Sequence, residues 1–286
     1  CANTGLANWC RDNGVLLQIL RYARTFGLPV WLRPVEATLA GDGVAAAGVV
    51  AGRLGLPAVP ALAETVALHT IFEIQRETGA RVHLCRLSSA AGIALLRAAR
   101  REGLPVTADV GVHHLHLTDV DIGYFDPDHR LDPPLRTQRD RDAIRAALAD
   151  GTIDAICSDH APVAEDDKLL PFGEAAAGAS ALETLLPLVL KWGEQARLPL
   201  AAVLAKVSSA AAQVLGEPTG RLAVGAKADV AVFDPQAPWT VGRAELVSRG
   251  GNTPFSGYEL VGRVALTLVG GEVRFDRKSG SESNFR

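Results

Sequence analysis

The stretch Ala155-Ile156-Cys157-Ser158-Asp159-His160-Ala161-Pro162 is an apolar run that ends on a serine and an aspartate. Such a run is typical of a short strand that is buried on both faces of a parallel sheet. In a parallel barrel the carboxyl end of each strand opens at the mouth, where a carboxylate can bind a divalent metal ion and accept the proton of an attacking water. Asp159 is therefore the candidate general base and metal ligand, although an aspartate there can also simply cap the next turn.

The sequence before this stretch alternates amphipathic segments with short apolar runs from residue 15 to residue 163. We predict strands at 29–33, 81–87, 105–110 and 153–158, and clear helices at 63–77 and 88–100. This α/β alternation predicts a (β/α)8 TIM barrel, with residues 1–220 supplying part of it. Four βα units make half of such a barrel and leave a strand edge unpaired, so we expect that these 286 residues do not fold alone.

Beyond a helical stretch predicted at 179–215, the sequence pattern changes at Gly220 from helical to β-type. Short β-type runs at 229–233 and 264–275, broken by Gly, Pro and Asn, predict a small β domain at 221–276. The polar end, 277–286, is expected to be a mobile tail.

Composition excludes several classes of function. A net charge of −3 and a pI near 6.2 argue against nucleic-acid binding, and no apolar run is long enough for a membrane span. Cys1, Cys10, Cys85 and Cys157 form no CxxC pair, which favours reduced thiols in a cytoplasmic protein. The chain contains no methionine, so position 1 is not expected to be a translation start, and the first ten residues do not resemble a signal peptide.

Two arginines end predicted strands where metal-binding side chains would otherwise point into the mouth. A guanidinium does not lose its proton, so neither Arg33 nor Arg86 can be a metal ligand. Either they are ordinary surface arginines, or they point inward and form ion pairs with Asp159 or Glu36 that replace the charge of a metal ion.

The histidines allow both structural and metal-binding interpretations. In His113-His114-Leu115-His116 we expect one ring to pack beneath the mouth and another to face water, because adjacent side chains of a strand point to opposite faces. His83 is predicted to be a hydrogen-bonded core histidine on the same strand face as Cys85.

Several segments together carry a resemblance to a known family. They are Ala63-Glu64, 81–89, 106–110 with 113–115, 132–136, 157–162, 182–184, 220–222 with 228–229, and 252–255. As a set they resemble the dihydroorotase branch of the amidohydrolase superfamily over about residues 15–276. That family has a (β/α)8 barrel of the amidohydrolase type with a small β domain, and the resemblance implies that the C-terminal half of the barrel is visible in this sequence.

The resemblance also implies roles for individual residues. Asp159 matches the family's metal-binding aspartate and general base, while Arg33 and Arg86 stand where the family has metal-binding histidines. Among substrate-binding positions, Asp132 replaces an asparagine, and Ala177 and Gly178 fall near backbone that touches the substrate. Val163 replaces the histidine that the family has shortly after the metal-binding aspartate. The His-x-His pair of the first strand, its neighbouring arginine and the bridging residue of the fourth strand have no counterpart here.

The family implies zinc-dependent opening of the dihydroorotate ring in pyrimidine biosynthesis, but two of this chain's metal positions are arginines. The sequence therefore looks most like the inactive dihydroorotase-like chains that associate with the aspartate transcarbamoylase catalytic subunit. We expect no metal cofactor and a homo- or hetero-oligomeric scaffold. Two alternatives remain: an active zinc-dependent dihydroorotase with a relocated metal near His83, His113 or His114, and a ligand sensor in which Arg33 and Arg86 hold a carboxylate.

Overall fold

A sheet of four parallel strands forms the centre of the molecule in the computed structural model, which describes residues 12–278 and 281–282. The strands lie in the order β1-β4-β5-β6. They are β1 (Val30–Leu32), β4 (Val82–Leu84), β5 (Val106–Gly111) and β6 (Ala155–Cys157). The four predicted strands are confirmed, and three of them are shorter than predicted because the polar loops begin earlier.

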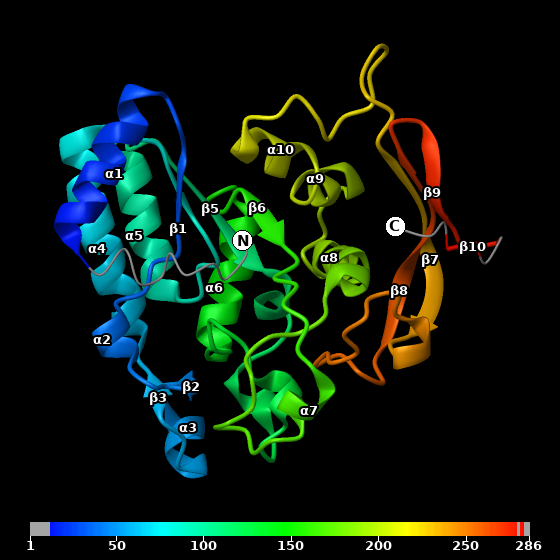
Figure 1. Cartoon of the computed structure of the whole chain (residues 1–286), viewed down its shortest axis with the longest axis horizontal. Helices are drawn as coiled ribbons and strands as arrows, with labels where there is room; N and C mark the ends of the chain where they lie inside the picture. The colour runs from blue at the N-terminus through cyan, green and yellow to red at the C-terminus, as the bar shows by residue number, and fades with distance from the viewer. Residues whose placement is uncertain (1–11, 279–280, 283–286) are drawn as a thin grey trace.

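Helices that alternate with these strands cover the outer face of the sheet (Figure 1). They are α1 (Asn13–Thr25), α4 (Ala61–Thr78), α5 (Ala90–Arg101) and α6 (Gln138–Ala149). The apolar stripes of α1, α4 and α5 meet the strands in a buried core that includes Leu20, Leu68, Leu84 and Leu96. The buried residues of α6 belong to a second cluster, which it shares with β6. The connections between the strands return the chain to the edge where the next strand begins, so the four strands run parallel and all end at the opposite edge.

Short elements occupy the loops near that edge. They are α2 (Ala37–Ala40), β2 (Ala45–Ala46), α3 (Val49–Leu54), β3 (Ala58–Val59), α7 (Glu165–Lys168) and the 3-10 turns η2 (Val112–Leu115), η3 (Asp119–Ile122) and η4 (Pro127–His129). Strands β2 and β3 pair in parallel as a separate small sheet.

The helical stretch predicted at 179–215 is three helices, namely α8 (Leu182–Gln195), α9 (Leu200–Ala205) and α10 (Ser209–Leu215). Arg197 adopts a left-handed backbone conformation after α8, and Pro199 is the N-cap of α9, so the helix cannot continue through this point. Trp192 of α8 is completely buried in the larger of the hydrophobic clusters.

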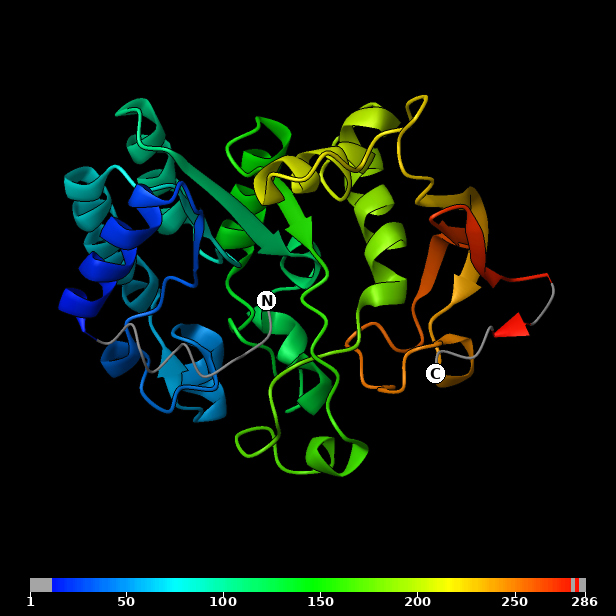
Figure 2. The same ribbon diagram turned by 45° about the horizontal axis from the view of Figure 1, so that its top comes forward.

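A second, antiparallel sheet packs against α8 on the side away from the parallel strands (Figures 1 and 2). Its strands lie in the order β10-β9-β8-β7 and are β7 (Val230–Thr240), β8 (Glu259–Val269), β9 (Glu272–Asp276) and β10 (Ser281–Glu282), with the 3-10 turn η5 (Arg243–Glu245) between β7 and β8. A Cβ at Gly262 would lie against the Leu190 side chain of α8, so this glycine permits the close approach. Of the expected mobile tail, residues 279–280 and 283–286 lie outside the described part of the chain.

A buried carboxylate joins α4 to the start of α5. Glu64 accepts hydrogen bonds from the backbone N–H groups of Ser88 (2.8 Å) and Ser89 (3.0 Å) and from both hydroxyls. Ser89 is the N-cap of α5, and the Ser88 hydroxyl also accepts a bond from Arg136 Nε at 3.0 Å. One carboxylate therefore satisfies the helix terminus and anchors the loop that follows β4.

No helix in the described part of the chain combines the length and the apolar character that crossing a membrane requires.

We expect Glu64→Ala to lower the free energy of unfolding by about 3 kcal/mol or more, because it leaves buried donors without an acceptor. Urea unfolding monitored by circular dichroism measures this change. Glu73→Ala on the same helix is the control, since Glu73 is largely exposed and its salt bridge with Arg76 should contribute less than about 1 kcal/mol. Equal losses in the two variants would contradict the structural role of Glu64.

Candidate functional site

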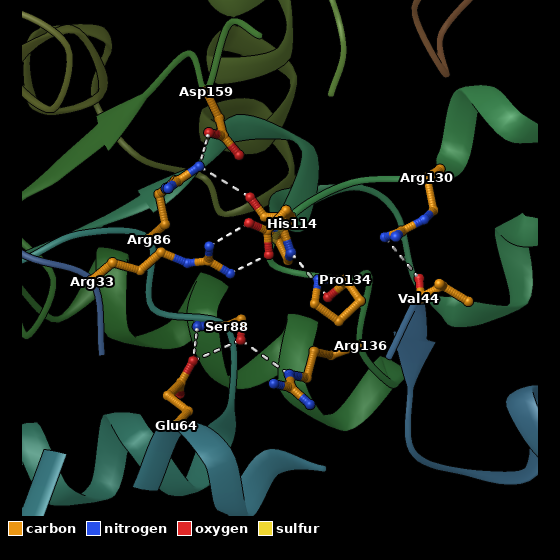
Figure 3. A network of polar contacts seen from close by, with 11 residues as sticks. Arg33, Val44, Glu64, Arg86, Ser88, His114, Arg130, Pro134, Arg136 and Asp159 are labelled. Carbon is orange, nitrogen blue, oxygen red and sulfur yellow. Dashed lines mark hydrogen bonds and ion pairs between the residues drawn. The ribbon is translucent and has the colours of Figure 1, made fainter. Parts of the chain in front are cut away.

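Three charged side chains, those of Arg33, Arg86 and Asp159, meet at the carboxyl ends of the parallel strands (Figure 3), and a fourth joins them from a loop. Arg33 directly follows β1, Arg86 lies two residues beyond β4 and Asp159 two residues beyond β6. Asp132 arrives from the loop between η4 and α6. The parallel sheet brings the three strand-end residues to one mouth, and the loop before α6 adds Asp132.

Arg86 and Asp159 form the central ion pair of this mouth. Arg86 Nη1 lies 2.9 Å from Asp159 Oδ1 and also donates to the Asp132 carbonyl oxygen at 3.0 Å. The two side chains are only 15% and 10% exposed. Burial, the largest single effect, would lower the pKa of Arg86, but the carboxylates of Asp159 and Asp132 together raise that pKa above its ordinary value. The ion pair expected between a strand-end arginine and Asp159 is therefore present.

Both members of this pair adopt left-handed backbone conformations, with φ of 57° at Arg86 and 50° at Asp159. Non-glycine residues rarely adopt such values, and they cluster at functional sites when the surrounding structure enforces them. The backbone therefore turns sharply at both positions to aim the two side chains into the mouth.

Arg33 forms its salt bridge with Asp132, a partner that the sequence did not predict. Both guanidinium Nη atoms of Arg33 donate to the two carboxylate oxygens of Asp132, which makes the pair bidentate. Glu36, the partner considered from the sequence, caps α2 by accepting the Leu39 N–H at 2.7 Å. Asp132 thus faces a guanidinium here, in a position where the sequence suggested contact with a substrate.

A polar cavity of about 520 Å³ opens beside these pairs. Arg33, Asp132, Arg130, Arg136 and Ala177 are among its lining residues. The side chain of Arg130 approaches the Val44 carbonyl oxygen at 3.4 Å, and burial lowers its pKa (Figure 3). The cavity is rich in cationic side chains, each held by protein groups.

Gly178 lies next to Ala177, and protein atoms engage both of its backbone polar groups. Its N–H donates to the Arg130 carbonyl at 2.9 Å and its carbonyl accepts from Asn252 Nδ2 at 3.0 Å. The amide oxygen of the same asparagine accepts the N–H of Val163 at 3.1 Å. Asn252 therefore fixes the loop that follows Asp159, and of the two backbone positions suggested by the sequence only Ala177 lines the cavity.

The prediction that one of the two adjacent histidines faces water is wrong. His113 and His114 are both buried, because they lie on the 3-10 turn η2 and not on a strand. His113 stacks on Phe255 with ring centroids 5.8 Å apart, and burial lowers its pKa to about 3. His116 bonds the Leu188 carbonyl oxygen through Nε2 at 2.8 Å, and burial lowers its pKa to about 4.

His114 lies closest to the mouth. Its Nε2 contacts the Pro134 carbonyl oxygen at 3.3 Å, which requires the proton on Nε2, and burial lowers its pKa. Its Nδ1 is buried and has no hydrogen-bond partner among residues 12–278. A Cβ at Gly111 would lie 3.5 Å from this Nδ1 and 3.2 Å from Asp159 Oδ2, so both atoms face the space that the glycine leaves.

The side chains at this mouth do not fit a zinc ion held in the family's manner. The two strand ends that should supply imidazoles carry guanidinium groups, which donate hydrogen bonds and cannot coordinate a metal. The remaining carboxylate, Asp159, is already paired with Arg86. A divalent ion here would also meet the positive charges of both arginines.

Sequence reasoning missed the buried Glu64 network and the cavity position of Arg130. The signal for Glu64 was a carboxylate in the first turn of a helix otherwise rich in apolar residues.

His83 is the hydrogen-bonded core histidine that was predicted, with Nδ1 2.8 Å from Thr107 Oγ1 and Nε2 3.0 Å from Asp109 Oδ2. Cys85 and Cys157 form no disulfide in the described part of the chain, and Cys1 and Cys10 lie outside it.

We expect acid to destabilise the protein through its buried histidines. The folded state keeps His113 and His116 neutral, whereas unfolded imidazoles bind protons below about pH 6.5, so stability falls as the pH decreases from 7 to 5. Each imidazole should contribute about 2 kcal/mol to this loss. Urea unfolding at both pH values should show that His116→Gln loses about 2 kcal/mol less than wild type. Identical losses would mean that His116 does not titrate on unfolding.

Removing one member of the central pair should destabilise the fold. Arg86→Met is expected to lower the free energy of unfolding by about 3 kcal/mol, because it leaves the Asp159 carboxylate buried and unpaired. Arg97→Met removes the exposed pair with Asp150 and should cost less than about 1 kcal/mol. Adding Asp159→Asn to Arg86→Met should recover part of the loss in a double-mutant cycle. Additive effects of the two substitutions would argue against a coupled pair.

Comparisons with known proteins agree with this architecture. The amidohydrolase family matches residues 39–275. A dihydroorotase-like protein of Pseudomonas putida is 44% identical over 92% of this chain and 62% of its own length. A dihydroorotase of Anaeromyxobacter dehalogenans (strain 2CP-1) is 42% identical over 92% of this chain and 61% of its own length. The chain thus spans about three fifths of the length of these relatives.

Solved structures show the same fold. The L-hydantoinase (dihydropyrimidinase) of Arthrobacter aurescens superposes with a TM-score of 0.83 at 25% identity, over 93% of this chain and 61% of that one. The D-hydantoinase of Thermus sp. gives a TM-score of 0.81 at 26% identity, over 93% and 60%. The expected fold class, an amidohydrolase (β/α)8 barrel with a β domain, is confirmed. The chain therefore belongs to the amidohydrolase family, and within it the chain is similar to dihydroorotases and dihydroorotase-like proteins.

Proposed function

We propose that this protein is a catalytically silent dihydroorotase-like subunit of pyrimidine biosynthesis, which acts as a scaffold or regulator of aspartate transcarbamoylase. The observation that carries the proposal is the buried pair of Arg86 and Asp159, 2.9 Å apart. It engages the carboxylate that an active family member would use as metal ligand and general base.

The chemical argument concerns water activation. A metal-dependent amidohydrolase needs a cation that lowers the pKa of bound water and a carboxylate that accepts its proton. Here the guanidinium groups of Arg86 and Arg33 supply positive charge at two strand ends, but neither can bind and polarise a water as a Lewis acid. Two unit charges about 4 Å apart near a protein surface repel by about 4 kcal/mol, which further disfavours a divalent ion beside them.

The scaffold role and the partner rest on the family resemblance. Inactive dihydroorotase-like chains associate with aspartate transcarbamoylase, and this sequence carries the substitutions expected of such a chain. Relatives in Pseudomonas putida and Pseudomonas aeruginosa, 44% and 42% identical, bear the name dihydroorotase-like protein. Retention of the fold and of the core around a mouth without metal-binding imidazoles is consistent with selection for assembly.

A second candidate function is an active dihydroorotase with a relocated metal. The unpartnered Nδ1 of His114 favours it, because this atom and Asp159 Oδ2 face the same space beside Gly111. Neutral imidazole nitrogen and carboxylate oxygen are both zinc donors. The ligand-sensor alternative stays a prediction, and in this structure the guanidinium groups of Arg33 and Arg86 already bind carboxylates of the protein.

The decisive experiment assays the full-length protein for opening and closure of the dihydroorotate ring. We expect no turnover above the buffer rate, and no change after treatment with a chelator or after addition of zinc. Turnover that a chelator removes, and that Asp159→Ala also abolishes, would overturn the proposal in favour of the active enzyme.

The scaffold role is tested by sedimentation with the aspartate transcarbamoylase catalytic subunit of the same organism. We expect a joint complex at micromolar concentration, and Asp159→Asn should leave it intact because assembly does not use the carboxylate. Separate sedimentation of the two proteins would remove the scaffold role while leaving the assay result unaffected.

A further inference from the structure

A second cluster of polar side chains lies on the strands beneath the mouth. His83 and Cys85 alternate along β4 and its end, so they share one face, and Asp109 comes from the neighbouring strand β5. All three are buried. One potential ligand atom from each, an imidazole nitrogen, a thiol sulfur and a carboxylate oxygen, lies within 4.8 Å of the other two.

We propose that His83, Cys85 and Asp109 form a binding site for one soft divalent metal ion of the zinc class. This site lies beyond the proposed function, because none of its three donor side chains takes part in the ion pairs that carry the silent-subunit argument. Its role is structural, since the ion would join the ends of β4 and β5 beneath the loop that carries Arg86.

The donor types determine which metal fits. Zinc binds nitrogen, sulfur and oxygen donors together in tetrahedral sites, whereas magnesium and calcium require oxygen donors almost exclusively. Asp109 Oδ1 also lies 3.5 Å from the thiol of Cys157 on β6, the strand that pairs with β5. Cys157 is thus the nearest candidate for a fourth ligand.

The groups that orient these donors are already in place. Thr107 Oγ1 lies 2.8 Å from His83 Nδ1, and the backbone N–H of Arg86 donates to Asp109 Oδ1 at 2.6 Å. Hydrogen bonds of this kind hold metal-binding imidazoles and carboxylates in position, and their loss typically weakens binding. The site therefore needs little rearrangement of the backbone to accept an ion.

Metal entry would redistribute two protons. Without metal, Nε2–H of His83 donates to Asp109 Oδ2 at 3.0 Å. When Nε2 coordinates the ion, the imidazole stays neutral if its proton moves to Nδ1, where it can donate to Thr107 Oγ1. The thiol of Cys85, whose pKa burial and then Asp109 raise to about 12, would become a thiolate and release one proton to solvent. Affinity should therefore increase with pH.

The test uses the full-length, reduced protein after a chelator has removed bound metal. Titration with Cd²⁺ should produce thiolate-to-metal charge-transfer absorption that saturates at one ion per Cys85. Cys85→Ser should abolish this component, and Asp109→Asn and His83→Gln should each weaken binding tenfold or more. Circular dichroism of the metal-free variants checks that each is folded. If Cys85→Ser or His83→Gln does not fold, Asp109→Asn still tests the site, because it preserves the shape of the side chain.

Cys157→Ser is the matched control, since it removes a neighbouring thiol outside the three-donor set. Retention of the absorption in Cys157→Ser and its loss in Cys85→Ser would support the site as stated. Loss in both variants would support it with Cys157 as the fourth ligand. Undiminished absorption in Cys85→Ser, or no Cd²⁺ binding by the wild-type protein at tenfold molar excess, would overturn the proposal.

Discussion

The ion pair between Arg86 and Asp159 is the constraint on which the mouth of this barrel depends. It joins the ends of two strands that are not neighbours in the sheet, and it holds two residues in backbone conformations that they would otherwise avoid. The same guanidinium reaches the Asp132 carbonyl, and Asp132 in turn holds Arg33. Four loops are thereby tied together by charges that belong to the protein itself.

This arrangement replaces a metal ion electrostatically but not chemically. A cation among carboxylates neutralises their mutual repulsion, and fixed guanidinium groups do the same for Asp159 and Asp132. What they lack is an open coordination position. Under the proposed function, the fold would retain the architecture of a hydrolase without the feature that activates water. The proposed second site differs from the mouth, because it does contain donors that can bind a metal ion. There an imidazole, a thiol and a carboxylate lie together in the interior, and hydrogen bonds hold the imidazole and the carboxylate.

Much of the fold could be predicted from the sequence, because strands buried on both faces leave short apolar runs and helices leave periodic ones. The pairing of Arg86 with Asp159 was predictable for a topological reason, since parallel strands end at one edge. The partner of Arg33 was not, because Asp132 lies 99 residues away on an irregular loop whose path no local pattern determines. His113 and His114 were misjudged because the period of a strand was applied to a 3-10 turn. Glu64 was missed as a structural residue because its partners, Ser88 and Ser89, lie 24 and 25 residues further along the chain, beyond β4.

Gly111 has a consequence for how the mouth can change over evolution. A Cβ at this position would lie 3.2 Å from Asp159 Oδ2 and 3.5 Å from His114 Nδ1, so the space beside the glycine is slightly too small for a methyl group. The size of the side chain at position 111 therefore determines how closely Asp159 and His114 can approach each other. An alanine would push Asp159 away from Arg86 or displace His114, so an exchange of this glycine would have to be accompanied by a change in the ion pair itself.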